Sequence, residues 1–151
     1  MEYLLDDSIG FRLNRTANII HAGFSKCIEP FGIAPEQFAT LKIISEDGEI
    51  TQSEIAEMLA KGKPTVSRAL DALEKKGLIV RERKSEDRRI KPIRLTDRGQ
   101  EILDLVIPKA LTFNNAIKAR LTPDEIKTFY RVLDTIVDTS ETHTKQLGAS
   151  L

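Results

Sequence analysis

Side chains that build disulfides and zinc sites are scarce in this chain. Its 151 residues include one cysteine, Cys27, and two histidines, His21 and His143. A single cysteine excludes an internal disulfide and fits a reducing compartment, so we expect a cytoplasmic protein. A zinc site needs about four suitably spaced ligands, and the two histidines lie far apart in the sequence, so no metal is expected.

Catalytic sequence motifs are also missing. The chain has no Gly-rich phosphate loop, no nucleophile elbow and no His-Glu metal motif. The paired carboxylates Asp6-Asp7 and Glu86-Asp87 fall in expected loops or helix caps, where solvated charge is the ordinary state. We therefore expect a protein that is not an enzyme and that needs no cofactor.

Long hydrophobic runs and net charge are absent as well. No apolar run approaches the roughly 18 residues of a membrane span and no secretory signal is visible, so no membrane partner is expected. A net charge of zero argues at first against nucleic acid. The stretch 61–98, however, holds thirteen Lys and Arg against six Asp and Glu, a net charge of +7. Such asymmetry indicates a surface for a polyanion.

Two short helices joined by a tight turn are predicted in the middle of the chain. Thr51 and Glu54 have the spacing of a capping box, which predicts the first helix start. Gly62 is expected to let the backbone turn, and Pro64 suits the first turn of the second helix. The apolar residues of that helix recur on one face, at Val66, Ala69, Leu70 and Leu73. Gly77 is placed to end it, and the pair forms a helix-turn-helix.

The outer face of the second helix is polar. Thr65, Ser67 and Arg68 fall in its first two turns, the part of a recognition helix that reaches base edges. Arginine can bond O6 and N7 of guanine together, and Ser or Thr can contact bases or phosphates. From the pattern alone, an ordinary amphipathic helix with a solvated polar face stays open as the alternative.

A charged loop between two short strands follows the second helix. Residues 78–80 are apolar, and residues 93–95 alternate as an edge strand preceded by Pro92. Ile50 is expected to pair with this hairpin. Arg88 at the loop tip suits the narrow minor groove, and Asp87 would orient a neighbouring arginine. A solvated charged turn is the alternative for such a loop considered alone.

Amphipathic helices are predicted on both sides of this region. Before it lie a long helix ending at Pro30 and a helix over residues 32–45, each with periodic apolar positions. After it, Thr96 caps a helix in which Pro108 is expected to cause a kink or a break near Leu105. Thr122 caps a last helix, and the polar chain from about Thr142 is expected to fray.

Several segments together resemble the multiple-antibiotic-resistance-regulator (MarR) family of bacterial and archaeal transcription factors. They are residues 51–56, residues 66–79, Asp87-Arg88-Arg89 and Leu95-Thr96-Asp97-Arg98-Gly99. The resemblance covers nearly the whole chain and implies a fold that is mainly α with a small β-hairpin wing. It implies a single domain over residues 1–151, with a winged helix-turn-helix at about 34–98 and dimerisation helices at about 7–30 and 96–145.

The resemblance also implies a function. The chain would be a sequence-specific regulator that binds double-stranded DNA, most simply a homodimeric repressor on a palindromic operator, relieved by a small and often anionic aromatic ligand. Thr65, Ser67 and Arg68 would lie in the major groove and Arg88 in the minor groove. The residues expected to contact DNA are Thr51, Gln52, Ser53, Lys63, Pro64, Thr65, Ser67, Arg68, Asp87, Arg88, Arg89 and Lys91.

Some features leave other interpretations open. Gly62 departs from the family, in which a polar capping residue is common at that position. A winged helix used for protein–protein contact, or a thiol-based redox sensor using Cys27, remains an alternative function, although a half-buried structural cysteine is the favoured reading. His21, Phe24 and Phe38 could line an effector pocket, but core packing is favoured for both phenylalanines.

Overall fold

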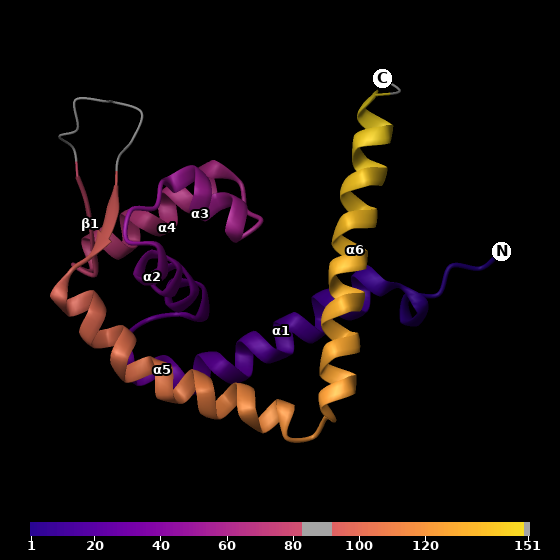
Figure 1. Ribbon diagram of the computed structural model, residues 1–151, viewed down its shortest axis with the longest axis horizontal. Helices are drawn as coiled ribbons and strands as arrows, with labels where there is room; N and C mark the ends of the chain where they lie inside the picture. Colours follow the sequence, from indigo (N-terminus) through magenta and orange to yellow (C-terminus); the bar gives the residue numbers. More distant parts are fainter. Residues whose placement is uncertain (83–91, 150–151) are drawn as a thin grey trace. The chain divides into compact units, whose positions relative to one another are not determined.

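The protein is mainly α-helical with a small antiparallel β-hairpin, as predicted (Figure 1). The computed structural model describes residues 1–82 and 92–149. The predictions for Asp87, Arg88, Arg89 and Lys91 therefore lie outside the described residues. The chain divides into two compact units, Met1–Leu111 and Thr112–Leu151.

The first unit contains the helix-turn-helix and the hairpin. Its elements are η1 (Leu5–Asp7), α1 (Ile9–Ile28), η2 (Glu29–Phe31), α2 (Pro35–Asp47), α3 (Gln52–Met58), α4 (Lys63–Lys75), β1 (Ile79–Arg81), β2 (Ile93–Leu95) and most of α5 (Asp97–Lys118). The second unit contains the end of α5 and α6 (Pro123–Ala149). Gly32 ends η2 and does not begin α2, so the second helix starts three residues later than predicted.

Side-chain caps begin four of the helices, α1, α3, α5 and α6, and those of α3, α5 and α6 lie at the predicted residues. The hydroxyls of Ser8, Thr51, Thr96 and Thr122 each accept a hydrogen bond from the backbone N–H three residues on, at 3.3, 3.2, 3.0 and 3.2 Å. Glu54 and Glu125 reach back to the N–H groups of Thr51 and Thr122, which completes two capping boxes. These starts are set by residues close together in sequence, and the predictions for them are confirmed.

The turn between α3 and α4 differs from the prediction. Ala60, and not Gly62, has the left-handed backbone, with φ of 51°. The N–H groups of Ala60 and Lys61 bond to the carbonyls of Glu57 and Ala56, each at 3.0 Å, and so close the end of α3. Gly62 is extended and is the N-cap of α4, without a side-chain bond. The prediction failed because α3 ends early enough to place the left-handed position on an alanine.

The hairpin packs on the helix-turn-helix. β1 and β2 pair antiparallel, with Ile79 opposite Leu95 and Arg81 opposite Ile93. The N–H of Ile93 also donates to the carbonyl of Ile50 at 3.4 Å, which confirms the predicted pairing of Ile50. This contact joins the hairpin to the segment that leads into α3.

Two glycines allow the chain to pass from α4 to α5. Gly77 is left-handed, with φ of 73°, and ends α4 as predicted. The hydroxyl of Thr96 donates to the carbonyl of Gly77 at 2.6 Å. A Cβ on Gly99 would lie 2.0 Å from the carbonyl oxygen of Leu78, so only glycine fits there. The Leu-Thr-x-x-Gly segment therefore fixes the start of α5 against the end of α4.

The hydrophobic core of the described chain lies in the first unit. Its fully buried side chains come from the five α-helices of that unit and from the hairpin: Ile28, Leu41, Ile44, Ile55, Val66, Leu70, Leu73, Ile93, Leu103 and Val106. Phe24 and Phe38 pack edge to face with ring centroids 5.6 Å apart. This core holds α4 through one face and leaves the opposite face of the helix exposed.

A break in α5 and a frayed end of α6 were expected, and neither is present in the described chain. α5 continues through Pro108, so the chain does not break near Leu105. The carbonyl that loses its partner there belongs to Asp104, which is exposed, so water can replace the missing bond. α6 extends past Thr142 to Ala149 and does not fray. Hydroxyls along α6, such as those of Thr139 and Thr144, bond to carbonyls four residues back and so remain within the helix.

None of the helices in the described part of the chain combines the length and the apolar character that crossing a bilayer requires.

Candidate nucleic-acid interface

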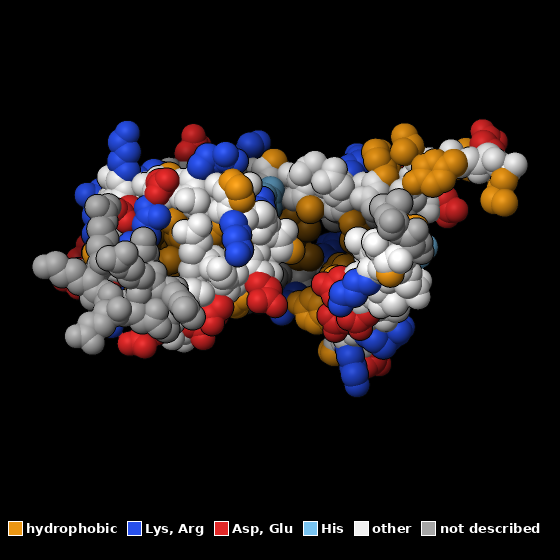
Figure 2. Space-filling model, turned by 90° about the horizontal axis from the view of Figure 1, so that it is seen from above, with side chains coloured by type: hydrophobic (Ala, Val, Ile, Leu, Met, Phe, Trp, Pro, Cys, Tyr) orange, Lys and Arg blue, Asp and Glu red, His pale blue; other side chains and the backbone are white. Residues whose placement is uncertain are grey.

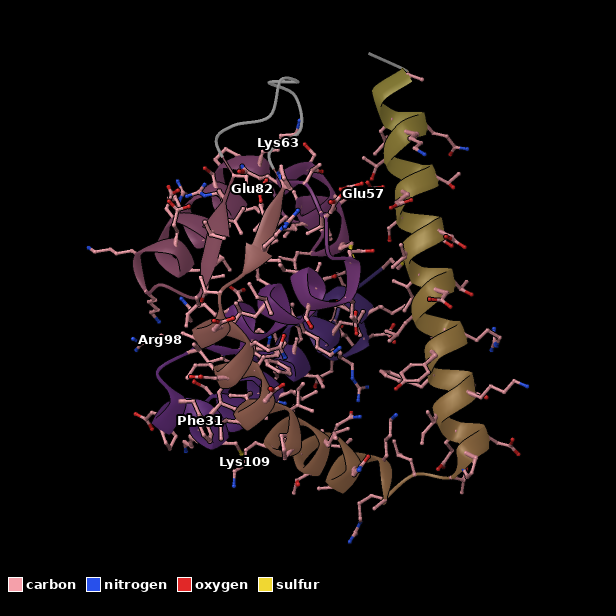
Figure 3. The ribbon with its side chains drawn as sticks, turned by 60° about the vertical axis from the view of Figure 1, so that its left-hand side comes forward. Phe31, Glu57, Lys63, Glu82, Arg98 and Lys109 are labelled. Atoms are coloured by element: carbon pink, nitrogen blue, oxygen red, sulfur yellow. The ribbon has the colours of Figure 1, made fainter. Side chains whose placement is uncertain are left out.

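The first turns of α3 and α4 lie together at one end of the first unit. The side-chain amide of Gln52, the first residue of α3, donates to the carbonyl of Lys63, the first residue of α4, at 3.5 Å. Figure 3 shows Lys63 at the same end of the unit as Glu82, whereas Phe31 and Lys109 lie at the opposite end. The N-termini of the two helices thus share one surface, and the one of α4 has no side-chain cap.

The predicted contact residues of α4 face outward. Ser67 is half-buried, and the other four are exposed: Lys63, Pro64, Thr65 and Arg68. On the opposite face Val66, Leu70 and Leu73 are buried at 1, 0 and 0% exposure. The fold therefore presents the polar side of α4 to solvent, in the arrangement that a helix needs in order to enter a DNA groove.

The predicted contact residues of α3 divide into two kinds. The Thr51 hydroxyl is occupied, because it accepts from the Glu54 N–H at 3.2 Å and donates to the Glu54 carboxylate at 2.8 Å. The backbone N–H of Thr51, and after it the Thr51 hydroxyl, donate to the Glu54 carboxylate and hold its pKa below the usual value. Gln52 is half-buried and links the two helices, whereas Ser53 is exposed. Ser53 is thus the most accessible polar side chain of the three.

Several cations of the basic stretch bond to other parts of the protein. Lys61 pairs with Glu36 at 2.6 Å, and Arg94 lies 3.5 and 3.6 Å from Glu49 and Glu82. By contrast, Lys63 and Arg68 have no ion-pair partner among residues 1–82 and 92–149. The charge count in the sequence therefore overstates the free positive charge, and Lys63 and Arg68 are the cations that remain available on the first two turns of α4.

Arg81 fixes the base of the hairpin to α4. Its guanidinium is 21% exposed, bonds Glu74 at 2.6 Å and also pairs with Asp71. The hydrogen bonds that Arg81 donates to these two carboxylates, the one to Asp71 first, raise the pKa of Arg81 above its usual value. Sequence reasoning missed this role, because the partners lie seven and ten residues upstream and no local pattern brings them together.

The ends of the wing segment are held next to each other. The N–H of Glu82 donates to the carbonyl of Pro92 at 3.1 Å. The residues between them, including the expected contacts Asp87, Arg88, Arg89 and Lys91, lie outside the described residues. The segment that carries them thus starts and finishes at the hairpin, on the end of the unit where Lys63 lies (Figure 3).

An acidic hollow bounds the basic surface. It has a volume of about 280 Å³ and is lined by Asp47, Glu49, Ile50, Glu54, Glu57 and Met58. Carboxylates repel phosphates, so a polyanion on this surface would avoid the hollow. The surface suited to nucleic acid is therefore limited to the first turns of α3 and α4 and the hairpin.

The other candidate residues lie elsewhere. Cys27 is exposed in the last turn of α1, so the expectation of a half-buried cysteine is wrong for this chain. His21 is also exposed. Phe24 is buried and packs on Phe38, which confirms core packing for Phe24. In the described residues, no group of three or more His, Cys, Asp or Glu side chains is arranged to hold a metal.

Comparisons with known proteins agree with this geometry. The sequence model of the MarR family matches residues 33–91. The HTH-type transcriptional regulator YwoH of Bacillus subtilis (strain 168) is 30% identical over 118 residues, which cover 78% of this chain and 85% of that protein.

Solved structures of similar fold extend the likeness along the chain. The transcriptional repressor CouR bound to a 23-mer DNA duplex is 30% identical, with a TM-score of 0.79, over 91% of this chain and 99% of that one. CouR bound to p-coumaroyl-CoA is 28% identical, with a TM-score of 0.78, over 91% and 96% of the two chains. Fold, motif order and relatives agree, and the chain is a member of the MarR family of winged helix-turn-helix transcriptional regulators.

Proposed function

We propose that this protein binds double-stranded DNA as a homodimer and represses transcription at a palindromic operator. One observation carries the proposal: α4 exposes Lys63 and Arg68, without partners in the described residues, beside the start of α3. Cations held on a rigid helix and not used inside the protein suit contacts to an outside polyanion. CouR, which is 30% identical, is bound to a DNA duplex in its structure.

In this proposal α4 is the recognition helix and lies in the major groove. Thr65, Ser67 and Arg68 reach base edges, since they occupy the exposed side of its first two turns. Lys63 and Ser53 contact phosphates from the adjoining helix starts, where the helix dipoles also favour negative charge. Arg88 enters the minor groove, with Asp87 and Arg89 supporting it.

Exposed apolar side chains support the homodimer. α1 exposes Ile9, Ile19 and Ile20 at 59, 56 and 40%, and α6 exposes Phe129 and Val137 at 51 and 54%. Figure 2 shows further hydrophobic side chains at the surface of the N-terminal segment. Apolar surface of this extent marks an interface. A two-fold dimer would place two recognition helices about 34 Å apart, one turn of DNA.

We propose that a small ligand relieves repression. CouR is known bound to p-coumaroyl-CoA as well as to DNA, which supports a ligand-responsive regulator. A ligand can change DNA binding only by binding one dimer arrangement more tightly than the other. A repressor must reach the chromosome, which lies in the cytoplasm of bacteria and archaea. We therefore place the protein in the cytoplasm.

The test is binding to the promoter DNA of the protein's own gene. We expect a gel shift of that fragment in preference to a composition-matched random fragment. The logarithm of the affinity should fall linearly with the logarithm of salt concentration, by about 0.9 for each phosphate contact. If neither fragment is retained even at low ionic strength, the proposal is wrong, and the protein–protein alternative is the one to test next.

A further inference from the structure

Both ends of α4 are tied to one short segment of the chain. We call residues 32–37 the anchoring segment; it runs from the end of η2 into the first turn of α2. Before α4, the Lys61 ammonium pairs with the Glu36 carboxylate at 2.6 Å. After α4, the Lys76 ammonium donates to the carbonyl of Gly32 at 2.8 Å and to the side-chain oxygen of Gln37 at 2.9 Å.

The anchoring segment is itself fixed. The Gln37 oxygen that receives Lys76 also accepts from the N–H of Ala34 at 3.1 Å. Gly32 is left-handed and its N–H donates to the carbonyl of Glu29 at 3.1 Å. Ile33 is buried at 6% exposure. A segment held by internal hydrogen bonds and a buried side chain can serve as a reference for the helix bonded to it.

The apolar face of α4 does not by itself define how the helix is aimed. Burial of Val66, Leu70 and Leu73 holds α4 on the core, but apolar burial has no preferred direction. Hydrogen bonds are directional, and they weaken steeply when donor and acceptor are misaligned. The helix is about 20 Å long, so anchors at both ends set its tilt more closely than one anchor would.

We propose that Lys61 and Lys76 are positioning residues that aim α4 at DNA without contacting it. This inference rests on the proposed function of α4 as the recognition helix. It divides the lysines around α4 into two classes. Lys61 and Lys76 bond to the anchoring segment, whereas Lys63 and Lys75 are exposed and have no partner in the described part of the chain.

The polar contacts at the two ends differ in kind. The hydrogen bond from Lys61 holds the pKa of Glu36 below its usual value, because it stabilises the charged carboxylate. Lys76 donates to two neutral oxygens at once. The geometry of these two hydrogen bonds therefore fixes the position of its ammonium group more than charge attraction does. Loss of either contact should loosen the aim of α4 and leave the number of phosphate contacts unchanged.

The first experiment compares Lys76→Met with Lys75→Met and Lys63→Met. For each, binding to the operator and to an unrelated duplex is measured at several salt concentrations. Lys76→Met should lower the operator preference about tenfold and keep the wild-type salt slope. Lys63→Met should reduce the slope by about one unit. Lys75→Met should keep the operator preference.

Two results would overturn the proposal. If Lys76→Met weakens both duplexes equally and reduces the salt slope, Lys76 is a phosphate contact. If it changes neither quantity, it has no role in DNA recognition. Glu36→Met removes the acceptor of Lys61 at the other end and should lower operator preference in the same way. Circular dichroism spectra matching the wild type would show that each variant is folded.

A second measurement does not depend on DNA. Spin labels on exposed positions of α2 and α4, through Ser45→Cys and Ala72→Cys in a Cys27→Ser background, report the distance between these helices. Labelled chains are diluted with unlabelled protein to isolate distances within one chain. Lys76→Met should broaden the distance distribution, and Lys75→Met should not. If the distance distribution of Lys76→Met is unchanged, the positioning role of Lys76 is refuted. If the wild-type protein does not bind DNA, only the proposed function is refuted.

Discussion

At the scale of single residues, Gly99 has the least freedom to change. A Cβ there would meet the Leu78 carbonyl oxygen at 2.0 Å, and that atom belongs to the backbone and cannot move aside cheaply. Gly99→Ala should therefore lower the free energy of unfolding by about 2–4 kcal/mol, measured by urea denaturation. Gly148→Ala is the control, because nothing lies within 4 Å of its added Cβ. Equal stability of the two variants would show that the α4–α5 contact is loose.

Ala60 carries a backbone conformation that suits glycine better. Its φ of 51° closes the end of α3, and an L side chain is strained there. Ala60→Gly should raise the free energy of unfolding by about 0.5–1 kcal/mol. This is the net of two effects: relief of backbone strain stabilises the folded state, and the greater conformational entropy of glycine stabilises the unfolded chain. Gly62→Ala is the matched comparison, since Gly62 has an ordinary extended backbone. A lower melting temperature for Ala60→Gly would count against strain at this turn.

Arg68 is the exposed cation best placed to distinguish bases. It lies on the outer face of α4 and has no ion-pair partner within the described residues. Arg68→Ala should cost about 1–3 kcal/mol of operator binding and relax discrimination at one base-pair position. Binding to a set of single-base operator variants would measure this. Equal weakening on every variant would make Arg68 a phosphate contact.

At the scale of elements, the capping box of α3 links stability to pH. The Thr51 hydrogen bonds lower the pKa of Glu54, so the carboxylate stabilises the fold above its unfolded pKa and loses that contribution as pH falls through the lower folded pKa. Glu54→Gln keeps an acceptor at the same place but cannot titrate. Between about pH 6 and pH 3, wild-type stability should fall more than that of Glu54→Gln. Parallel pH profiles would mean that the box is not formed in solution.

The elements also show which features can be predicted from sequence. Helix starts were predictable, because a cap such as Thr51 with Glu54 or Thr122 with Glu125 acts within four residues. The outward face of α4 was predictable from its apolar period. The roles of Ala60, Arg81 and Lys76 were not, because they depend on where α3 ends and on partners that only the folded chain brings together. Sequence therefore identified the candidate interface but not what positions it.

At the scale of the whole molecule, the proposed mode of DNA binding requires two chains acting together. One recognition helix covers only half of a palindromic site, so a lone chain should bind with little affinity. The second unit offers a way to test this, because α6 exposes Phe129, Tyr130 and Val137 at 51, 49 and 54%. These apolar side chains need a covering surface, and the homodimer would supply it.

Val137→Asp places a charge in that apolar surface and should convert the dimer into monomers, measured by analytical ultracentrifugation. Operator affinity should then fall at least about a hundredfold, because the second recognition helix is no longer tethered to the first. Thr139→Asp adds the same charge two residues on, where the helical period turns it to another side of α6, and should leave the dimer intact. If Val137→Asp stays dimeric, α6 is not the interface. If it becomes monomeric yet binds the operator as before, a single chain is sufficient for recognition and the two-fold proposal is wrong.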